Sequence, residues 1–222
     1  MQTRIEITND GSHTLFVPEL NEHYHSTFGA VQESRVVFIQ SGLNFLDPAR
    51  SPLQILEVGF GTGLNAFLTC LECEKSSRQI HYTGVEKFPL SKGITDLLNY
   101  PDFIDHSMQP VFRLIHNAPW NLATSITGNF RLLKIDKDIR DIFPENTTYD
   151  LVYFDAFGPE VQPELWTEEI FQKIAFSMKN GGILVTYSVK GAVRRALKNS
   201  GFEVEKIPGP PGKREITRAT KK

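Results

Sequence analysis

A glycine-rich segment carries the clearest chemical signal in the sequence. It contains one acidic residue and three glycines: Glu57, Gly59, Gly61 and Gly63. Glycines let the backbone turn tightly at the end of a strand and let a ligand approach with no Cβ in the way. The last two glycines are two residues apart, not three as in the dinucleotide fingerprint. This spacing favours an S-adenosylmethionine site with Glu57 near the ligand's ammonium group. A dinucleotide site or a turn without ligand is the alternative.

Acidic residues also follow the next two predicted strands. Glu86 ends the strand at 79–85, where a carboxylate can accept hydrogen bonds from both hydroxyls of a ribose. At the third strand end, Asp136 or Asp138 could accept the amino group of adenine. We favour Asp138, because the apolar side chain of Ile139 could cover the base. A simple loop carboxylate or helix N-cap is the alternative at this position.

A further carboxylate, Asp155, follows the strand at 151–154. This position borders the crevice of an open α/β sheet, where a ligand and its co-substrate meet. Asp155 could orient an amine acceptor and accept its proton, and the bend at Gly158-Pro159 could supply carbonyl oxygens. Phe157 could stack on a planar acceptor. Trp166 is better explained as a core residue.

Two other groups of residues carry weaker signals. Cys70 and Cys73 form a CxxC inside a predicted helix, but no second ligand pair at a matching spacing follows. His23 and His25 flank Tyr24 without a further metal ligand nearby. We therefore predict no metal site, and we interpret the cysteines as helix packing.

Composition and charge exclude several classes of protein. The chain has 222 residues, of which 40% are hydrophobic and 23% charged. These proportions argue against disorder, and the absence of a long apolar run argues against a membrane span or a signal peptide. Two cysteines fit a reducing compartment. We therefore expect a soluble cytoplasmic protein.

The charge is distributed unevenly along the chain. Residues 190–222 contain ten basic and three acidic residues, a net charge of +7, which leaves −9 for the remainder of a chain with net charge −2. A basic end on an acidic body can hold a phosphate backbone locally. Lys190 and Arg194 share one face of a predicted helix. A solvated helix face with a frayed tail is the alternative.

The predicted elements place these residues at one edge of a sheet. Strands alternate with helices, which implies a mostly parallel sheet covered on both faces. The predicted strands are 53–58, 79–85, 131–135, 151–154, 183–187, 202–207 and 214–219, and the predicted helices are 64–75, 89–98, 164–178 and 190–199. The last two strands are joined by PGPPGK and should pair antiparallel. This α/β arrangement of seven strands is typical of Rossmann-like class I methyltransferases. We predict such a domain at 46–222 and a small N-terminal cap at 1–45, with an extended segment and a helix near 27–40.

Taken together, the motifs resemble the methyltransferase domain of the MnmC family, which acts in tRNA 5-methylaminomethyl-2-thiouridine biosynthesis. The resemblance covers nearly the whole chain. The matching segments are Asp10-Gly-Ser12, Tyr24-His-Ser26, Gly29-Ala30, Glu33-Ser34, Gly59-Phe-Gly-Thr-Gly-Leu-Asn65, Asp155-Ala-Phe-Gly-Pro-Glu-Val-Gln-Pro-Glu-Leu-Trp166, Lys190-Gly191, Val193-Arg194-Arg195 and Gly212-Lys-Arg-Glu215.

The resemblance implies transfer of a methyl group from S-adenosyl-L-methionine to the exocyclic amine of 5-aminomethyluridine, with or without 2-thiolation, at the wobble position of tRNA. It implies three sets of site residues. The cofactor set is Glu57, Gly59, Phe60, Gly61, Gly63, Asn65, Glu86, Lys87, Asp138 and Ile139, with Tyr24 and Glu33 of the cap closing over it. The catalytic set is Asp155 and Phe157. The tRNA set is Lys190, Arg194, Arg195, Lys213 and Arg214.

Three alternatives remain beside this interpretation. A small-molecule N-methyltransferase and an aminopropyl transferase share the fold, although an aminopropyl transferase needs an acidic cleft that the basic cluster opposes. In a non-catalytic cofactor-binding module, Asp155 would be inessential. Bifunctional relatives carry a flavin-dependent oxidase domain that forms the aminomethyl precursor, and this sequence stops at residue 222. We therefore expect a separate enzyme or route to supply that precursor.

Overall fold

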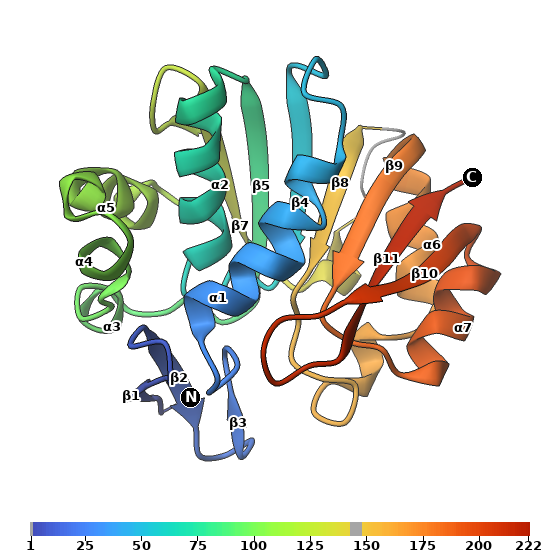
Figure 1. The fold of residues 1–222 in the computed structure, drawn as a ribbon, viewed down its shortest axis with the longest axis horizontal. Coiled ribbons are helices and arrows are strands. Elements are labelled where there is room, and N and C mark those ends of the chain that lie inside the picture. Colours follow the sequence, from blue (N-terminus) through green and yellow to red (C-terminus); the bar gives the residue numbers. More distant parts are fainter. Residues whose placement is uncertain (1, 143–147) are drawn as a thin grey trace.

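The main sheet has eight strands in the described part of the chain, residues 2–142 and 148–222 of a computed structural model. Their order is β10-β11-β9-β8-β4-β5-β7-β6 (Figure 1). The bounds are β4 (Leu53–Val58), β5 (Ile80–Glu86), β6 (Thr124–Ser125), β7 (Phe130–Asp136), β8 (Tyr149–Phe154), β9 (Met178–Thr186), β10 (Phe202–Pro208) and β11 (Glu215–Lys221).

Strand directions confirm the predicted Rossmann-like α/β fold. Strands β7, β5, β4, β8 and β9 pair in parallel. Strand β11 runs antiparallel to both of its neighbours, β9 and β10, and so forms the predicted hairpin. The two-residue β6 is an additional antiparallel edge strand beside β7, too short to leave a pattern in the sequence.

Helices cover both faces of the sheet, which explains why the central strands are apolar throughout. In β4 (LQILEV) and β8 (YDLVYF) nearly every side chain is buried, as a strand covered on both faces requires. Helix α2 (Leu64–Ser76) packs on one face. Helices α6 (Glu168–Ser177) and α7 (Gly191–Asn199) pack on the other, and these three confirm predicted helices (Figure 1).

The region between β5 and β6 differs from prediction. The expected helix at 89–98 is the single turn α3 (Lys92–Thr95), and two helices that we did not predict follow it: α4 (Tyr100–Ile104) and α5 (Gln109–Asn117). A proline stands in the first turn of both α4 and α5, where the missing N–H costs no hydrogen bond. Helix α5 buries Phe112 and Ile115 against α2.

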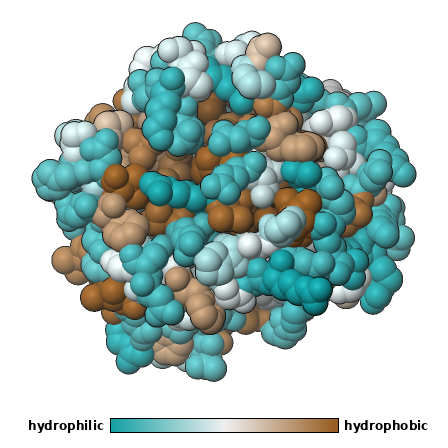
Figure 2. All heavy atoms as spheres, viewed as in Figure 1, coloured by the Kyte–Doolittle hydropathy of each residue, from teal (hydrophilic) through white to brown (hydrophobic). Residues whose placement is uncertain are grey.

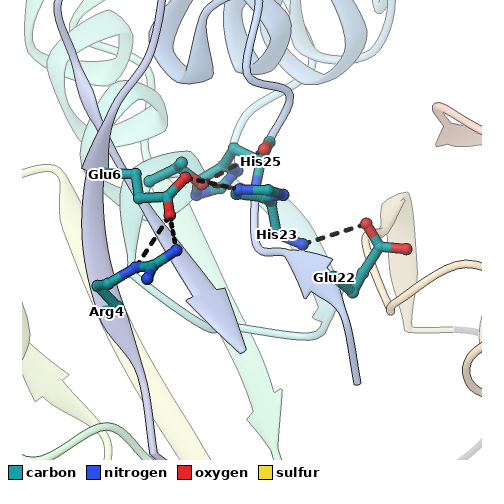
Figure 3. Close-up of polar contacts among 6 residues, drawn as sticks. Arg4, Glu6, Glu22, His23 and His25 are labelled. Atoms are coloured by element: carbon teal, nitrogen blue, oxygen red, sulfur yellow. Dashed lines mark hydrogen bonds and ion pairs between the residues drawn. The ribbon is translucent and has the colours of Figure 1, made fainter. Parts of the chain in front are cut away.

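The N-terminal segment is richer in structure than the single extended segment we expected. It forms a separate antiparallel sheet of β1 (Arg4–Ile7), β2 (His13–Val17) and β3 (Glu22–His23). Figure 3 shows Glu6 accepting hydrogen bonds from Arg4 Nη2 (2.6 Å) and pairing with His23 Nε2 (2.9 Å). These contacts link β1 to β3, although β2 lies between them.

The predicted helix near 27–40 is present as α1 (Ala30–Ser34), continued by a π-helical segment, Arg35–Gln40. Its Phe38 is buried against Tyr153 of β8, with 5.1 Å between ring centroids. The second half of the predicted cap therefore contributes to the main core. Among the described residues, no helix combines the length and apolar character that crossing a membrane requires.

We expect Phe38→Ala to lower the free energy of unfolding by about 3–5 kcal/mol, because the substitution leaves a cavity between the N-terminal helix and the sheet. Phe176→Ala is the matched control, since Phe176 on α6 is 61% exposed. Chemical denaturation of both variants measures the difference. Equal stability of the two variants would contradict the packing of this helix into the main core.

Candidate functional site

The predicted site residues meet at a cavity of about 660 Å³ at the carboxyl ends of the parallel strands. Three parts of the chain form its walls: the loops after β4, β5, β7, β8 and β9, the N-terminal segment 22–28 with Glu33, and the turn between β10 and β11. Figure 2, in the same orientation as Figure 1, shows hydrophobic side chains between hydrophilic ones across the middle of the molecule. The cavity is of the size that small-molecule sites have.

The glycine loop fits closely against the neighbouring loop after β8. Gly59 has φ +89°, and a Cβ on it would lie 2.6 Å from the carbonyl oxygen of Asp155. A side chain at this position would therefore separate the two loops. Phe60 packs beneath the loop against Trp120, with 5.9 Å between ring centroids. Gly63 begins α2 and does not line the cavity, whereas Gly59, Phe60 and Gly61 do.

Glu86 lies beside this loop at the end of β5. Its Oε2 accepts a hydrogen bond from the Gly61 N–H (2.9 Å), and its Oε1 accepts one from the Phe88 N–H (2.9 Å). Burial raises the pKa of Glu86, while these backbone donors oppose the rise. Each oxygen keeps a second acceptor position. Glu86 can therefore accept hydrogen bonds from two further donors in the cavity.

The structure distinguishes the two carboxylates that follow β7. Asp138 and Ile139 line the cavity, and Asp136 does not. Asp138 pairs with Lys87 Nζ (3.1 Å) and Arg140 Nη2 (2.7 Å). The hydrogen bonds from Arg140 hold the pKa of Asp138 well below its usual range, so the side chain is an anion and an acceptor only.

Asn65 joins the buried carboxyl group of Glu57 to the half-buried one of Asp155. Its Nδ2 donates to Glu57 Oε1 (2.9 Å) and to Asp155 Oδ2 (2.8 Å). Glu57 is fully buried and does not line the cavity, so Asn65 and Asp155 stand between it and a ligand. Asn65 lines the cavity, and its Oδ1 is buried without a hydrogen-bond partner among the described residues.

Burial and three neighbouring side chains shift the pKa of the Asp155 carboxyl group. Burial raises its pKa well above the usual value, and the negative charge of Glu33 raises it further, while the Asn65 hydrogen bond and Lys213 oppose the rise. Glu33 lies on α1 and forms an ion pair with Lys213, whose Nζ lies 4.1 Å from the Tyr187 ring centroid. The predicted cofactor residue Glu33 and the predicted tRNA residue Lys213 are thus direct partners.

Aromatic side chains hold the loop that carries Asp155. Phe157 contacts Tyr24 edge to face, with 5.0 Å between ring centroids. Tyr187 donates a hydrogen bond to the Ala156 carbonyl (2.8 Å). Trp166 is buried in the core, as expected, and its Nε1 donates to the Phe157 carbonyl (2.8 Å). The loop that carries Asp155 is therefore held from both sides.

The basic residues predicted to hold tRNA divide into two groups. Lys190, Lys213 and Arg214 line the cavity. Arg194 and Arg195 lie on α7 and do not line it; Arg194 Nε donates to the Val189 carbonyl (3.3 Å). The first group forms part of the cavity wall, and the second extends basic charge along the neighbouring helix.

The weaker sequence signals have structural explanations. Cys70 and Cys73 are buried in α2, and burial raises the pKa of each to about 12. His25 pairs with Thr62 Oγ1 (2.8 Å), and burial lowers its pKa to about 4, so the ring is neutral at pH 7. No cluster of three or more metal-ligating side chains occurs within the described ranges.

Sequence reasoning missed three aromatic residues of the cavity wall: Tyr187, Phe28 and Phe88. Tyr187 is the last residue of the predicted strand 183–187, and a side chain at the carboxyl end of a parallel strand is a candidate for the cavity wall. Phe88 follows Glu86 by two residues and could have been found by the same argument. The position of Phe28 in the wall could not be predicted from nearby residues, because it depends on a contact with residue 212.

Comparisons with known proteins agree with this geometry. Residues 111–222 match a family described as S-adenosyl-L-methionine-dependent methyltransferase. The chain is 32% identical to the tRNA 5-methylaminomethyl-2-thiouridine biosynthesis bifunctional protein MnmC of Paracidovorax citrulli, over 99% of this chain and 35% of that protein. It is 30% identical to the protein of the same name from Cupriavidus metallidurans, over 95% and 33% respectively. The chain spans about a third of the length of these curated relatives.

A solved structure is similar over almost the whole chain. The crystal structure of MNMC2 from Aquifex aeolicus superimposes with a TM-score of 0.82 at 28% sequence identity. The match covers 99% of this chain and 70% of that one.

The raised pKa of Glu57 gives a prediction for Glu57→Gln. A carboxyl group whose pKa is raised by folding stabilises the protein at pH values below its ordinary pKa of 4.5. This contribution to stability is lost as the pH rises through the pKa of the folded state. The Gln variant has no such group. The wild type should therefore lose stability from pH 5 to pH 8 relative to the Gln variant, so the free energy of unfolding of the variant minus that of the wild type should increase. Denaturation at both pH values measures this difference, and a constant difference would contradict the raised pKa.

Proposed function

The chain belongs to the S-adenosyl-L-methionine-dependent methyltransferases, and we propose that it methylates the exocyclic amine of 5-aminomethyluridine at the wobble position of tRNA. The product is 5-methylaminomethyluridine, with or without 2-thiolation. The relatives named for tRNA 5-methylaminomethyl-2-thiouridine biosynthesis support this substrate. The single observation that carries the chemistry is the half-buried carboxyl group of Asp155, which lines the cavity beside the glycine loop and accepts a hydrogen bond from Asn65.

The donor half of the cavity fits S-adenosyl-L-methionine. Glu86 has acceptor capacity for the ribose hydroxyls, and Asp138 with Ile139 lies one strand further along, where the adenine would be held. The unpartnered Oδ1 of Asn65 is an acceptor for the ammonium group of the methionine part. We assign Glu57 the role of orienting Asn65 rather than contacting the ligand. When bound, S-adenosyl-L-methionine supplies an electrophilic methyl carbon on a sulfonium centre.

On the acceptor side, Asp155 orients the amine and takes its proton. An aliphatic amine is mostly protonated at pH 7, and only the unprotonated amine has the free electron pair that methyl transfer needs. Because burial raises the pKa of Asp155, its carboxylate accepts a proton more readily than an exposed aspartate does. Asn65 Nδ2 holds the carboxylate in place by donating to Asp155 Oδ2, which leaves Asp155 Oδ1 for the amine.

The remaining wall residues position the nucleoside. Phe157 offers a ring face to a planar base, and its position is fixed by Tyr24 and by the Trp166 hydrogen bond to its carbonyl. Arg214 provides positive charge for a phosphate beside the target, whereas Lys190 pairs with Glu160 and Lys213 with Glu33 on the same wall. Anticodon-loop bases are single-stranded and can be splayed out, so this open cavity can receive one.

The biological setting is also a proposal. Formation of the aminomethyl group is a different reaction from methyl transfer, and we assign it to a separate enzyme activity. We place the reaction in the cytoplasm, because its tRNA substrate is found there.

We expect Asp155→Asn and Asp155→Ala to lower the rate of methyl transfer to tRNA at least about 100-fold, because neither side chain can accept the amine proton. Binding of S-adenosyl-L-methionine, measured by calorimetry, should change little. In cells lacking the protein, nucleoside mass analysis should show the unmethylated precursor, and neither variant should restore the product.

Asp96→Asn is the matched control, since Asp96 is exposed at the end of α3, outside the cavity. This variant should restore the methylated nucleoside as well as the wild type does. Full turnover by Asp155→Asn would show that another group accepts the proton, and absence of the precursor in the deletion strain would contradict the substrate.

We expect tRNA affinity to fall steeply with salt and Arg214→Ala to make that dependence shallower by about one unit of slope in log Kd against log salt. Arg214 lines the cavity on the turn that follows β10. Lys75→Ala on α2, whose lysine pairs with Glu72, is the control. Filter binding between about 50 and 200 mM salt measures the slopes. An unchanged slope for Arg214→Ala would remove this residue from the RNA interface.

A further inference from the structure

Two phenylalanines of the cavity wall remain about half exposed. Phe28 is 52% exposed and Phe88 is 47% exposed, whereas the other aromatic rings of the wall are buried or half-buried. Leaving a large apolar ring in water costs free energy that a packed position would recover. At the mouth of a binding cavity, exposed apolar surface marks contact with a ligand.

The sheet order separates the two rings. Phe88 follows β5 and belongs to the donor half of the cavity, beside Glu86 and Lys87. Phe28 contacts the turn between β10 and β11, on the opposite side of β4. The adenosine part of the methyl donor, held at the ends of β5 and β7, therefore cannot account for the exposure of Phe28.

The Phe28 ring is fixed by two segments that are far apart in sequence. A Cβ on Gly212 would lie 2.4 Å from the ring, and Gly212 has φ +84°, so the turn accepts the ring only because residue 212 is glycine. The Phe28 N–H donates to Ser26 Oγ (3.2 Å), and Glu33 Oε2 accepts from the Ser26 N–H (2.8 Å). The ion pair of Glu33 with Lys213 joins the N-terminal segment to the same turn that carries Gly212.

Positive charge adjoins the exposed ring. Lys213 and Arg214 follow Gly212 directly on the turn and line the same cavity. An aromatic ring held in place beside cations is the arrangement by which proteins bind single-stranded nucleic acid, with bases stacked on the ring and phosphates near the cations. A ring that is already fixed loses little conformational entropy on binding.

We propose that Phe28 is the stacking platform for the base of a nucleotide adjacent to the target uridine. This inference rests on the proposed function. The target base enters the cavity toward Asp155, and the neighbouring base lies flat on the exposed face of Phe28 at the rim. The site thus recognises a short single-stranded segment of RNA rather than a lone nucleoside.

The test compares Phe28→Ala with Phe28→Trp on an anticodon stem–loop RNA that carries 5-aminomethyluridine. Phe28→Ala should weaken RNA binding by about 5- to 150-fold, the loss typical of one stacked base. The slope of log Kd against log salt should stay at the wild-type value, because stacking releases no counterions, in contrast to Arg214→Ala. Phe28→Trp should bind as the wild type does, and the calorimetric affinity for S-adenosyl-L-methionine should be the same in all three proteins.

A second substrate separates stacking from a general defect. With the free nucleoside 5-aminomethyluridine, which has no neighbouring base, Phe28→Ala should turn over as fast as the wild type. Phe176→Ala, which removes an exposed phenylalanine on α6, should leave RNA binding unchanged. Wild-type RNA affinity in Phe28→Ala, or an equal loss with nucleoside and RNA, would overturn the platform while leaving the proposed function intact. Absence of methyl transfer by the wild type on both substrates would overturn the proposed function itself.

Discussion

The site depends on one amide, that of Asn65, which holds the buried carboxyl group of Glu57 and the half-buried one of Asp155 in place. Each carboxyl group, on Glu57 and on Asp155, would be costly to bury without a donor. The raised pKa of each reflects that cost. Because Asn65 stands in the first turn of α2, directly after the glycine loop, the ligand-binding turn and the proton acceptor are fixed by the same element. A proton acceptor of this kind needs burial to raise its affinity for protons and a fixed partner to keep its orientation.

The parallel strands and the carboxylates at their ends could be predicted from the sequence because both signals are local. Each of Glu57, Glu86 and Asp155 stands at the end of a strand-like run, which places all three at one edge of a parallel sheet. The separation of Asp138 from Asp136 and the burial of Glu57 behind Asn65 could not be predicted, because they depend on side-chain direction at strand ends. The three-stranded N-terminal sheet was missed because its strands are only two to five residues long.

The acceptor wall was the least predictable part, because it is built from the two ends of the chain. The pairing of Glu33 with Lys213 joins residues 180 positions apart, and neither residue type nor spacing indicates it. The family resemblance placed Glu33 with the cofactor and Lys213 with the tRNA. Their direct contact shows that the two sets form one continuous surface on which a change to either residue alters the environment of Asp155.

Strand β11 lies inside the sheet, between β9 and β10, although it follows both in the chain. A ribosome delivers the N-terminal part first. A growing chain therefore has the strands of the donor half available well before residue 213 emerges to meet Glu33. Until the hairpin inserts, β9 presents an open edge and the acceptor wall is missing. Closure of this sheet edge and formation of the Glu33–Lys213 ion pair therefore both wait for the hairpin of β10 and β11.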